Sequence, residues 1–268
     1  MKLFTYLTFL LCTFTSNLYA GVCNSKIDQT SPAQSSCQNL RKFQLRAQLK
    51  ELVIINKHDA ILHILSSAQF DHETVSRILI DFSIIHQNPE VFQLAINSSP
   101  DSFKDCVETV DFYHKTQFDD LLKAIKSSAI EQPGNKIKTA SYLNMAASIV
   151  RHKNFSKNEM SRVSLERFRD EVKKRESQYL QFLMSVAAEE LPFEGIEGIF
   201  GWPIIFSYLE NDAAPSPEKN RLVDMVRKEI LSTFIMGASE RQVNEPLYQF
   251  FFSQIYDKQL VGLIGNFL

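Results

Sequence analysis

The spacing of apolar positions along this chain is typical of helices. Five apolar residues, Val75, Ile78, Leu79, Phe82 and Ile85, are separated by steps of three, one, three and three, which places them on one face of a helix. No glycine occurs between Gly21 and Gly134. The tight β-hairpin turns that depend on glycine are therefore disfavoured over this stretch. The pattern predicts an all-α protein.

Three segments that start at Asp59, Pro89 and Asp119 share one pattern of apolar and polar positions. Each contains two apolar residues, one polar residue and two apolar residues in that order. We interpret residues 58–152 as a short α-solenoid-like region of stacked helix pairs, because one pair cannot bury its apolar face alone. Chance similarity between amphipathic helices remains the alternative. The second helices are expected to keep the same step at Phe82, Phe112 and Tyr142, and at Ile80, Val110 and Ala140.

Residues 153–268 are predicted to form a C-terminal helical region packed on these pairs. Ser156 and Glu159 have the spacing of a capping box at a helix start. Apolar residues then alternate at steps of three and four, which predicts one long helix over 156–190. Arg175 and Glu189 interrupt the apolar seam and argue against an extended coiled coil.

A final helical layer is expected after this long helix. Ser216 and Pro217 form a favourable helix start, and Gly237 is a favourable helix end. The apolar residues between them recur at steps of four, at Leu222, Val226, Ile230 and Phe234. The last residues of the chain are apolar on most sides, which predicts a helix buried between others.

Residues 192–203 interrupt the helical pattern and are predicted to form a loop. Three glycines three residues apart, two prolines and the only tryptophan of the chain lie together here. The candidate binding residues of this loop are its large apolar side chains, Phe193, Ile196, Ile199, Phe200 and Trp202. One alternative is that they face outward, because aromatic side chains are enriched where partners bind. The other is that they fold back onto the core.

The N-terminus has the pattern of a secretory signal peptide over residues 1–20. Lys2 precedes an apolar run, and Ala20 is a small residue at the expected cleavage site. We expect export to the periplasm or the cell exterior. In that case residues 21–57 form a polar segment and a first helix, in which Cys23 and Cys37 can form a disulfide or stay unpaired. Cys106 lies in an apolar helical pattern and is expected to be a free core residue.

The charge balance argues against nucleic acid as a partner. The chain has 29 basic and 31 acidic residues, and the basic residues are scattered rather than clustered. No apolar run after the signal peptide reaches the roughly 20 residues that span a bilayer. Peripheral contact with a membrane surface and the oligomeric state stay open.

No motif in the chain fixes a chemistry. No two of the six histidines are four residues apart, as a zinc-binding helix requires, and the nucleophile elbow and the phosphate-binding loop are missing. We therefore expect no metal, no cofactor and no catalytic residue. The sequence favours an exported, non-catalytic protein that binds another macromolecule, most naturally a protein. The alternative is a helical hydrolase of cell-wall or glycan substrates, in which two carboxylates converge only in the folded chain.

Overall fold

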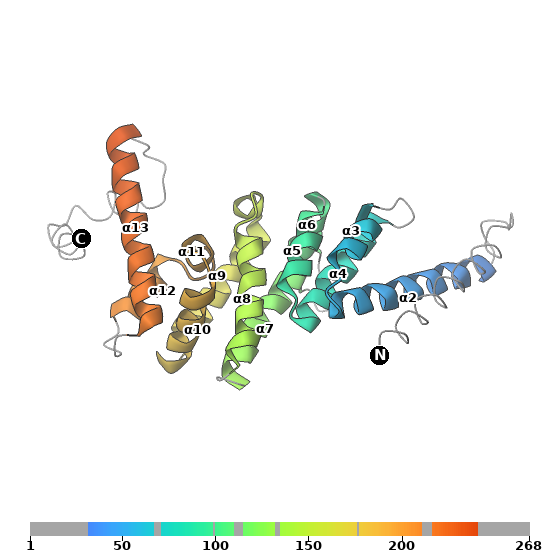
Figure 1. Cartoon of the computed structure of the whole chain (residues 1–268), viewed down its shortest axis with the longest axis horizontal. Coiled ribbons are helices and arrows are strands. Elements are labelled where there is room, and N and C mark those ends of the chain that lie inside the picture. The colour runs from blue at the N-terminus through green and yellow to red at the C-terminus, as the bar shows by residue number, and fades with distance from the viewer. Residues whose placement is uncertain are drawn as a thin grey trace. The chain divides into compact units, whose positions relative to one another are not determined.

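The structure is a computed structural model that describes residues 32–66, 71–98, 100–109, 115–131, 135–175, 177–210 and 216–240. Within these residues the chain forms twelve α-helices and one short 3₁₀ helix, η1, and no strand (Figure 1). The all-α prediction is confirmed. The chain divides into two compact units, residues 1–61 and 62–268. The described part of the first unit is α2 (Pro32–Ile54) and the start of α3 (His58–Ser66).

The predicted helix pairs correspond to six successive helices. The first helices of the pairs begin at His58, Pro89 and Gln117, within two residues of the positions expected from the repeat. In the second unit α4 packs against α5 and α6, α5 packs against α8, and α7 packs against α8. This packing fits a stack of helix pairs. The remaining bounds are α4 (His72–His86), α5 (Pro89–Asn97), α6 (Pro100–Glu108), α7 (Gln117–Glu131) and α8 (Lys136–Val150).

The 30-residue step is less regular in the second helix of each pair. The second helices begin at His72, Pro100 and Lys136, which are not 30 residues apart, and Val110 and Phe112 lie outside the described residues. The corresponding residues of the other two pairs, Phe82 and Tyr142, are buried as the repeat requires.

Short polar side chains start several of these helices. The backbone N–H of Thr74 donates to the Asp71 carboxylate at 3.0 Å ahead of α4, and that of Val91 donates to Asn88 at 3.1 Å ahead of α5. Asn135 caps α8 in the same way. Such caps satisfy N–H groups that have no partner within the helix, and they fix where each helix begins.

The predicted long helix over 156–190 is wrong, because two helices occupy this stretch. Helix α9 spans Glu159–Lys173 and α10 spans Ser177–Glu190. Six consecutive polar residues follow Val172, so the chain has no apolar side chain to bury where the helix breaks. After the break α10 packs against α8 and α13, whereas α9 packs against α6 and α7.

The capping box at the start of this stretch is also wrong. Residues Phe155–Lys157 form η1, and the cap of α9 is Asn158. Its side-chain oxygen accepts the backbone N–H of Ser161 at 2.8 Å. Ser156 therefore belongs to the preceding turn. The side-chain amide of Asn158 caps α9, in place of the Ser156 hydroxyl that was expected to do so.

The predicted C-terminal layer is α13, which spans Pro217–Glu240. Its start is confirmed, since the Ser216 hydroxyl accepts the backbone N–H of Lys219 at 3.1 Å. Its end is not at Gly237, because the helix continues for three residues beyond that position. Leu222, Val226 and Ile230 are buried as expected.

Several sequence predictions fall on parts of the chain outside the described residues. These are the signal peptide, Cys23 and the apolar C-terminal segment. Cys37 lies in α2, but its side chain is not among those described. Cys106 is free and fully buried, as expected. None of the helices in the described ranges is both long enough and apolar enough to cross a membrane.

Candidate functional site

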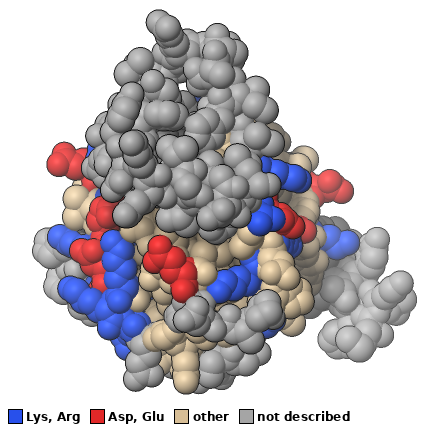
Figure 2. Space-filling view, turned by 90° about the vertical axis from the view of Figure 1, so that its left-hand side faces the viewer, with Lys and Arg blue, Asp and Glu red and all other residues tan. Residues whose placement is uncertain are grey.

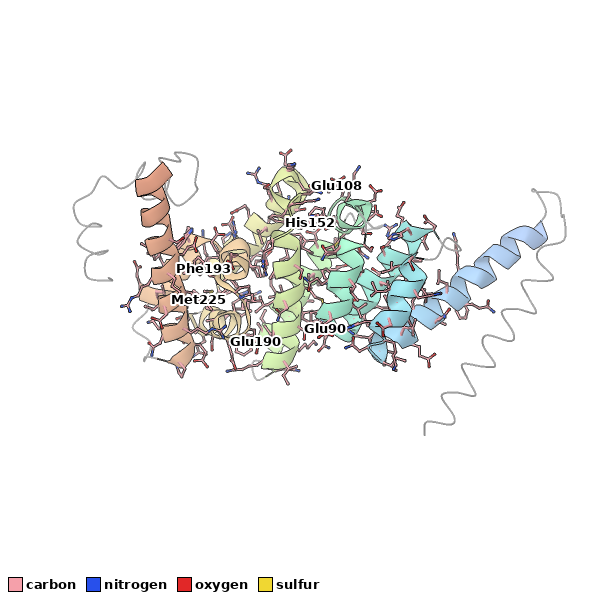
Figure 3. The ribbon with its side chains drawn as sticks, turned by 45° about the horizontal axis from the view of Figure 1, so that its top comes forward. Glu90, Glu108, His152, Glu190, Phe193 and Met225 are labelled. Carbon is pink, nitrogen blue, oxygen red and sulfur yellow. The ribbon has the colours of Figure 1, made fainter. Side chains whose placement is uncertain are left out.

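The predicted binding loop over 192–203 is two helices, α11 (Phe193–Phe200) and α12 (Trp202–Glu210). The loop prediction is therefore wrong. Its five candidate side chains are all buried, and none is more than 9% exposed (Phe193 is labelled in Figure 3). Trp202 packs between Phe193 and Phe206, with ring centroids 5.3 Å from each. Of the two alternatives, the structure has the one in which these side chains fold back onto the core.

Two of the three glycines allow α11 to pack closely on α8. A Cβ atom at Gly195 would lie 3.1 Å from the Cβ of Ala147, and one at Gly198 would lie 2.8 Å from a methyl group of Val150. Both are shorter than ordinary van der Waals contacts. The three-residue spacing thus places the glycines on the helix face that meets α8, and it reflects packing rather than backbone freedom.

We expect Gly198→Ala to lower the free energy of unfolding by about 1–2 kcal/mol, since overpacking outweighs the gain of up to about 1 kcal/mol in helix propensity. Chemical denaturation would measure the change. In a Val150→Ala background the 2.8 Å contact is removed and only the Cβ of residue 150 remains, at 3.3 Å, so there the same substitution should cost clearly less. An equal cost in both backgrounds would contradict the close α8–α11 packing.

The third glycine, Gly201, separates α11 from α12. Its φ of 73° is in the region that disfavours residues with a Cβ atom. A Cβ atom at Gly201 would also lie 3.3 Å from the guanidinium carbon of Arg169. The turn between the helices therefore needs glycine for its backbone conformation and for the space that Arg169 occupies.

Arg169 of α9 caps the C-terminus of α11. Its Nε donates to the carbonyl of Ile199 at 3.0 Å, and its Nη2 donates to the carbonyl of Gly198 at 2.8 Å. A cation is favoured at this end of a helix, where the last carbonyls have no partner within the helix. Burial raises the pKa of the Glu197 carboxyl nearby, and the charge of Arg169 opposes that rise. We therefore assign these contacts of Arg169 to stabilising the fold.

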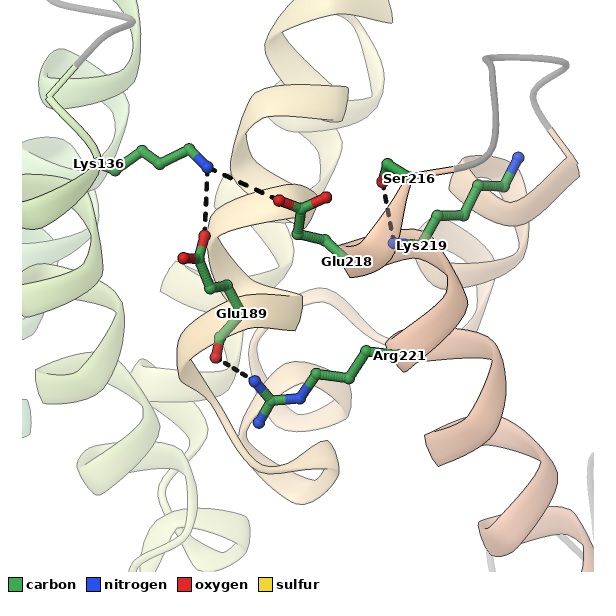
Figure 4. A network of polar contacts seen from close by, with 6 residues as sticks. All are labelled: Lys136, Glu189, Ser216, Glu218, Lys219 and Arg221. Carbon is green, nitrogen blue, oxygen red and sulfur yellow. Dashed lines mark hydrogen bonds and ion pairs between the residues drawn. The ribbon is translucent and has the colours of Figure 1, made fainter.

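Contacts between surface side chains also join α8, α10 and α13. Lys136 lies 3.2 Å from a carboxylate oxygen of Glu189 and 3.8 Å from one of Glu218 (Figure 4). Arg221 donates to the backbone carbonyl of Glu189. These side chains are partly exposed, so each ion pair adds little stability. Seen from the α13 side, the described surface carries charges of both signs next to each other (Figure 2).

The described histidines do not form a metal site. No group of three or more histidine, cysteine or acidic residues that could hold a metal ion occurs in the described ranges. His152, labelled in Figure 3, stacks on Phe103 with ring centroids 4.0 Å apart. Burial lowers its pKa, with a smaller contribution from the charge of Lys153. Its role is packing.

A pocket of about 340 Å³ between α7 and α9 is the strongest candidate site among the described residues. Leu122 and Phe168 are the apolar side chains that line it, and both are buried. Four basic side chains and two acidic ones surround them. The basic residues are Lys115, Lys123, Lys126 and Arg167, and the acidic ones are Asp119 and Glu171. We call this site the basic pocket.

Both carboxylates of the basic pocket are already engaged within the chain. Glu171 forms an ion pair with Lys126. Asp119 accepts the backbone N–H and the hydroxyl of Thr116, each at 2.9 Å, at the start of α7. The pocket has a net positive charge because its four basic side chains outnumber its two carboxylates.

Lys123 and Arg167 are the two cations of the basic pocket that indicate a ligand-binding role. Both are exposed, and within the described part of the chain neither makes an ion pair or a hydrogen bond. Sequence reasoning missed this site, because Lys123 and Arg167 lie more than 40 positions apart in the chain. Arg167 in particular looks like any exposed charge on an amphipathic helix.

Comparison with protein-family models, with curated proteins and with solved structures finds no match to this chain.

Proposed function

We propose that this chain is an exported, non-catalytic helical protein that binds another protein. The observation that carries the proposal is the basic pocket, where Lys123 and Arg167 are exposed and form no ion pair or hydrogen bond with the other described residues. Exposed cations beside an apolar floor suit recognition of a partner surface better than bond cleavage. The signal-peptide pattern of residues 1–20 supports export.

The hydrolase alternative has weaker support. The basic pocket does contain two carboxylates, as such a mechanism requires. However, an acid/base pair needs one carboxylate that can hold a proton beside its substrate and one that can accept a proton. Asp119 is held by a helix cap and Glu171 by a lysine, so both are already occupied with stabilising α7 and α9.

The test is to crosslink the protein in its own compartment and identify what copurifies with it. We expect one protein partner at a constant ratio to this chain, and no turnover of cell-wall or glycan substrates by the purified chain. Release of sugar fragments by the purified chain, with no protein crosslinked to it, would refute the proposal in favour of the hydrolase.

A further inference from the structure

Two exposed apolar side chains lie on the face of α9 that also carries Arg167 of the basic pocket. Met160 is 46% exposed and Val163 is 43% exposed, both near the start of α9. Arg167 follows them at spacings of seven and four residues, so the three side chains share one face of the helix. Leu165, Phe168 and Val172 of the same helix are buried, and Phe168 also lines the pocket.

The two helices that carry this surface, α7 and α9, pack against each other. Leu122 and Phe168 are at most 4% exposed and fix α7 and α9 against each other directly beneath the two cations. The ion pair between Lys126 and Glu171 joins the same two helices. Lys123 and Arg167 thus project into one pocket from two helices that pack against each other.

The charges on this surface select among anionic ligands. A nucleic-acid strand carries a negative charge about every 3.4 Å, and a strand in the pocket would lie against Asp119 and Glu171. It would also leave Met160 and Val163 without an apolar contact. A peptide with a few separated carboxylates and apolar side chains between them avoids both problems, and the planar guanidinium of Arg167 matches a carboxylate with two parallel hydrogen bonds.

We infer that the basic pocket, with Met160 and Val163, binds an acidic segment of the protein partner that also carries apolar side chains. Carboxylates of the segment pair with Lys123 and Arg167, and an apolar side chain covers Met160 and Val163. This inference rests on the proposed binding function, since it names the kind of partner.

The test is fluorescence anisotropy of labelled probes with the chain as the cell produces it. The main probe is a short peptide of alternating Glu and Leu, and its matched control has Gln in place of Glu. The other probes are a single-stranded oligonucleotide and phosphatidylglycerol vesicles. We expect the Glu peptide to bind at least about tenfold more tightly than the Gln peptide, and its binding to weaken with added salt.

Charge reversal locates the site. Lys123→Glu with Arg167→Glu should weaken binding of the Glu peptide by about tenfold or more. Lys173→Glu with Lys228→Glu makes the same change in net charge at exposed positions outside the pocket, and should leave binding within about twofold. Should the first double variant lose helicity, the milder Arg167→Gln substitution replaces it and should still weaken binding several-fold.

Three outcomes would overturn the inference. They are equal loss of binding in the two double variants, equal binding of the Glu and Gln peptides, and tighter pocket-dependent binding of the oligonucleotide or the vesicles. If crosslinking in the cell still identifies a protein partner, then the proposed function stands and only the acidic nature of the bound segment is wrong.

Discussion

Replacing Trp202 by alanine is expected to lower the free energy of unfolding by about 3–5 kcal/mol. The indole is 7% exposed and contacts Phe193 of α11 and Phe206 of α12, so its removal leaves a cavity where the two helices meet. Denaturant unfolding of the two proteins would measure the difference. Trp202→Phe is the control and should cost much less, because the ring contacts are largely kept.

The same tryptophan reports its own burial, since it is the only one in the chain. We expect blue-shifted emission that is resistant to a soluble quencher. Red-shifted, readily quenched emission, together with an unchanged unfolding midpoint in Trp202→Ala, would show that residues 192–203 face outward. In that case the binding-loop alternative would be correct.

Replacing Arg169 by alanine is expected to cost about 2–4 kcal/mol of unfolding free energy, because it leaves the carbonyls of Gly198 and Ile199 without their donors. Arg169→Lys should recover little of this, since a lysine cannot reproduce the two-pronged contact. Thermal or denaturant unfolding would measure both variants.

The matched control is Glu166→Ala, which removes only the partner of an exposed ion pair with Arg169. Its cost should stay below about 1 kcal/mol. Similar costs for Glu166→Ala and Arg169→Ala would contradict the role of Arg169 as the cap of α11.

Much of the helical architecture was predictable because it depends on local features. The apolar face of α4 depends only on the spacing of residues 75–85. The starts of α5 and α13 each depend on one or two adjacent residues, at Pro89 and at Ser216. The same locality misplaced the start of α9, since Ser156 and Asn158 are both good caps and only the surrounding packing selects Asn158.

The stretch from Pro192 to Pro203 could not be predicted in this way. Pro192 occupies the N-cap position of α11, and Pro203 lies in the first turn of α12. The N–H groups at these positions have no partner within the helix, so proline costs no helical hydrogen bond there. A side chain at position 198 would clash with Val150, which lies nearly 50 positions earlier in the chain. Residues that normally interrupt helices are therefore used here to pack two of them, and that is apparent only in the folded chain.

The basic pocket was unpredictable for a related reason. Lys123 and Arg167 each follow the ordinary pattern of an exposed charge on an amphipathic helix. Only the packing of α7 against α9 brings them to one site, and only the contacts of Asp119 and Glu171 show that the acids there are already satisfied.

Site-specific photo-crosslinking in the cell tests most directly whether this chain binds a protein at the basic pocket with Met160 and Val163. A photoreactive amino acid would replace Met160, beside the basic pocket, and in a matched variant would replace Asp224 on α13, whose side chain is 71% exposed. We expect a covalent adduct with one other protein from position 160 and none from position 224. No adduct from position 160, or the same adducts from both positions, would contradict binding at this surface.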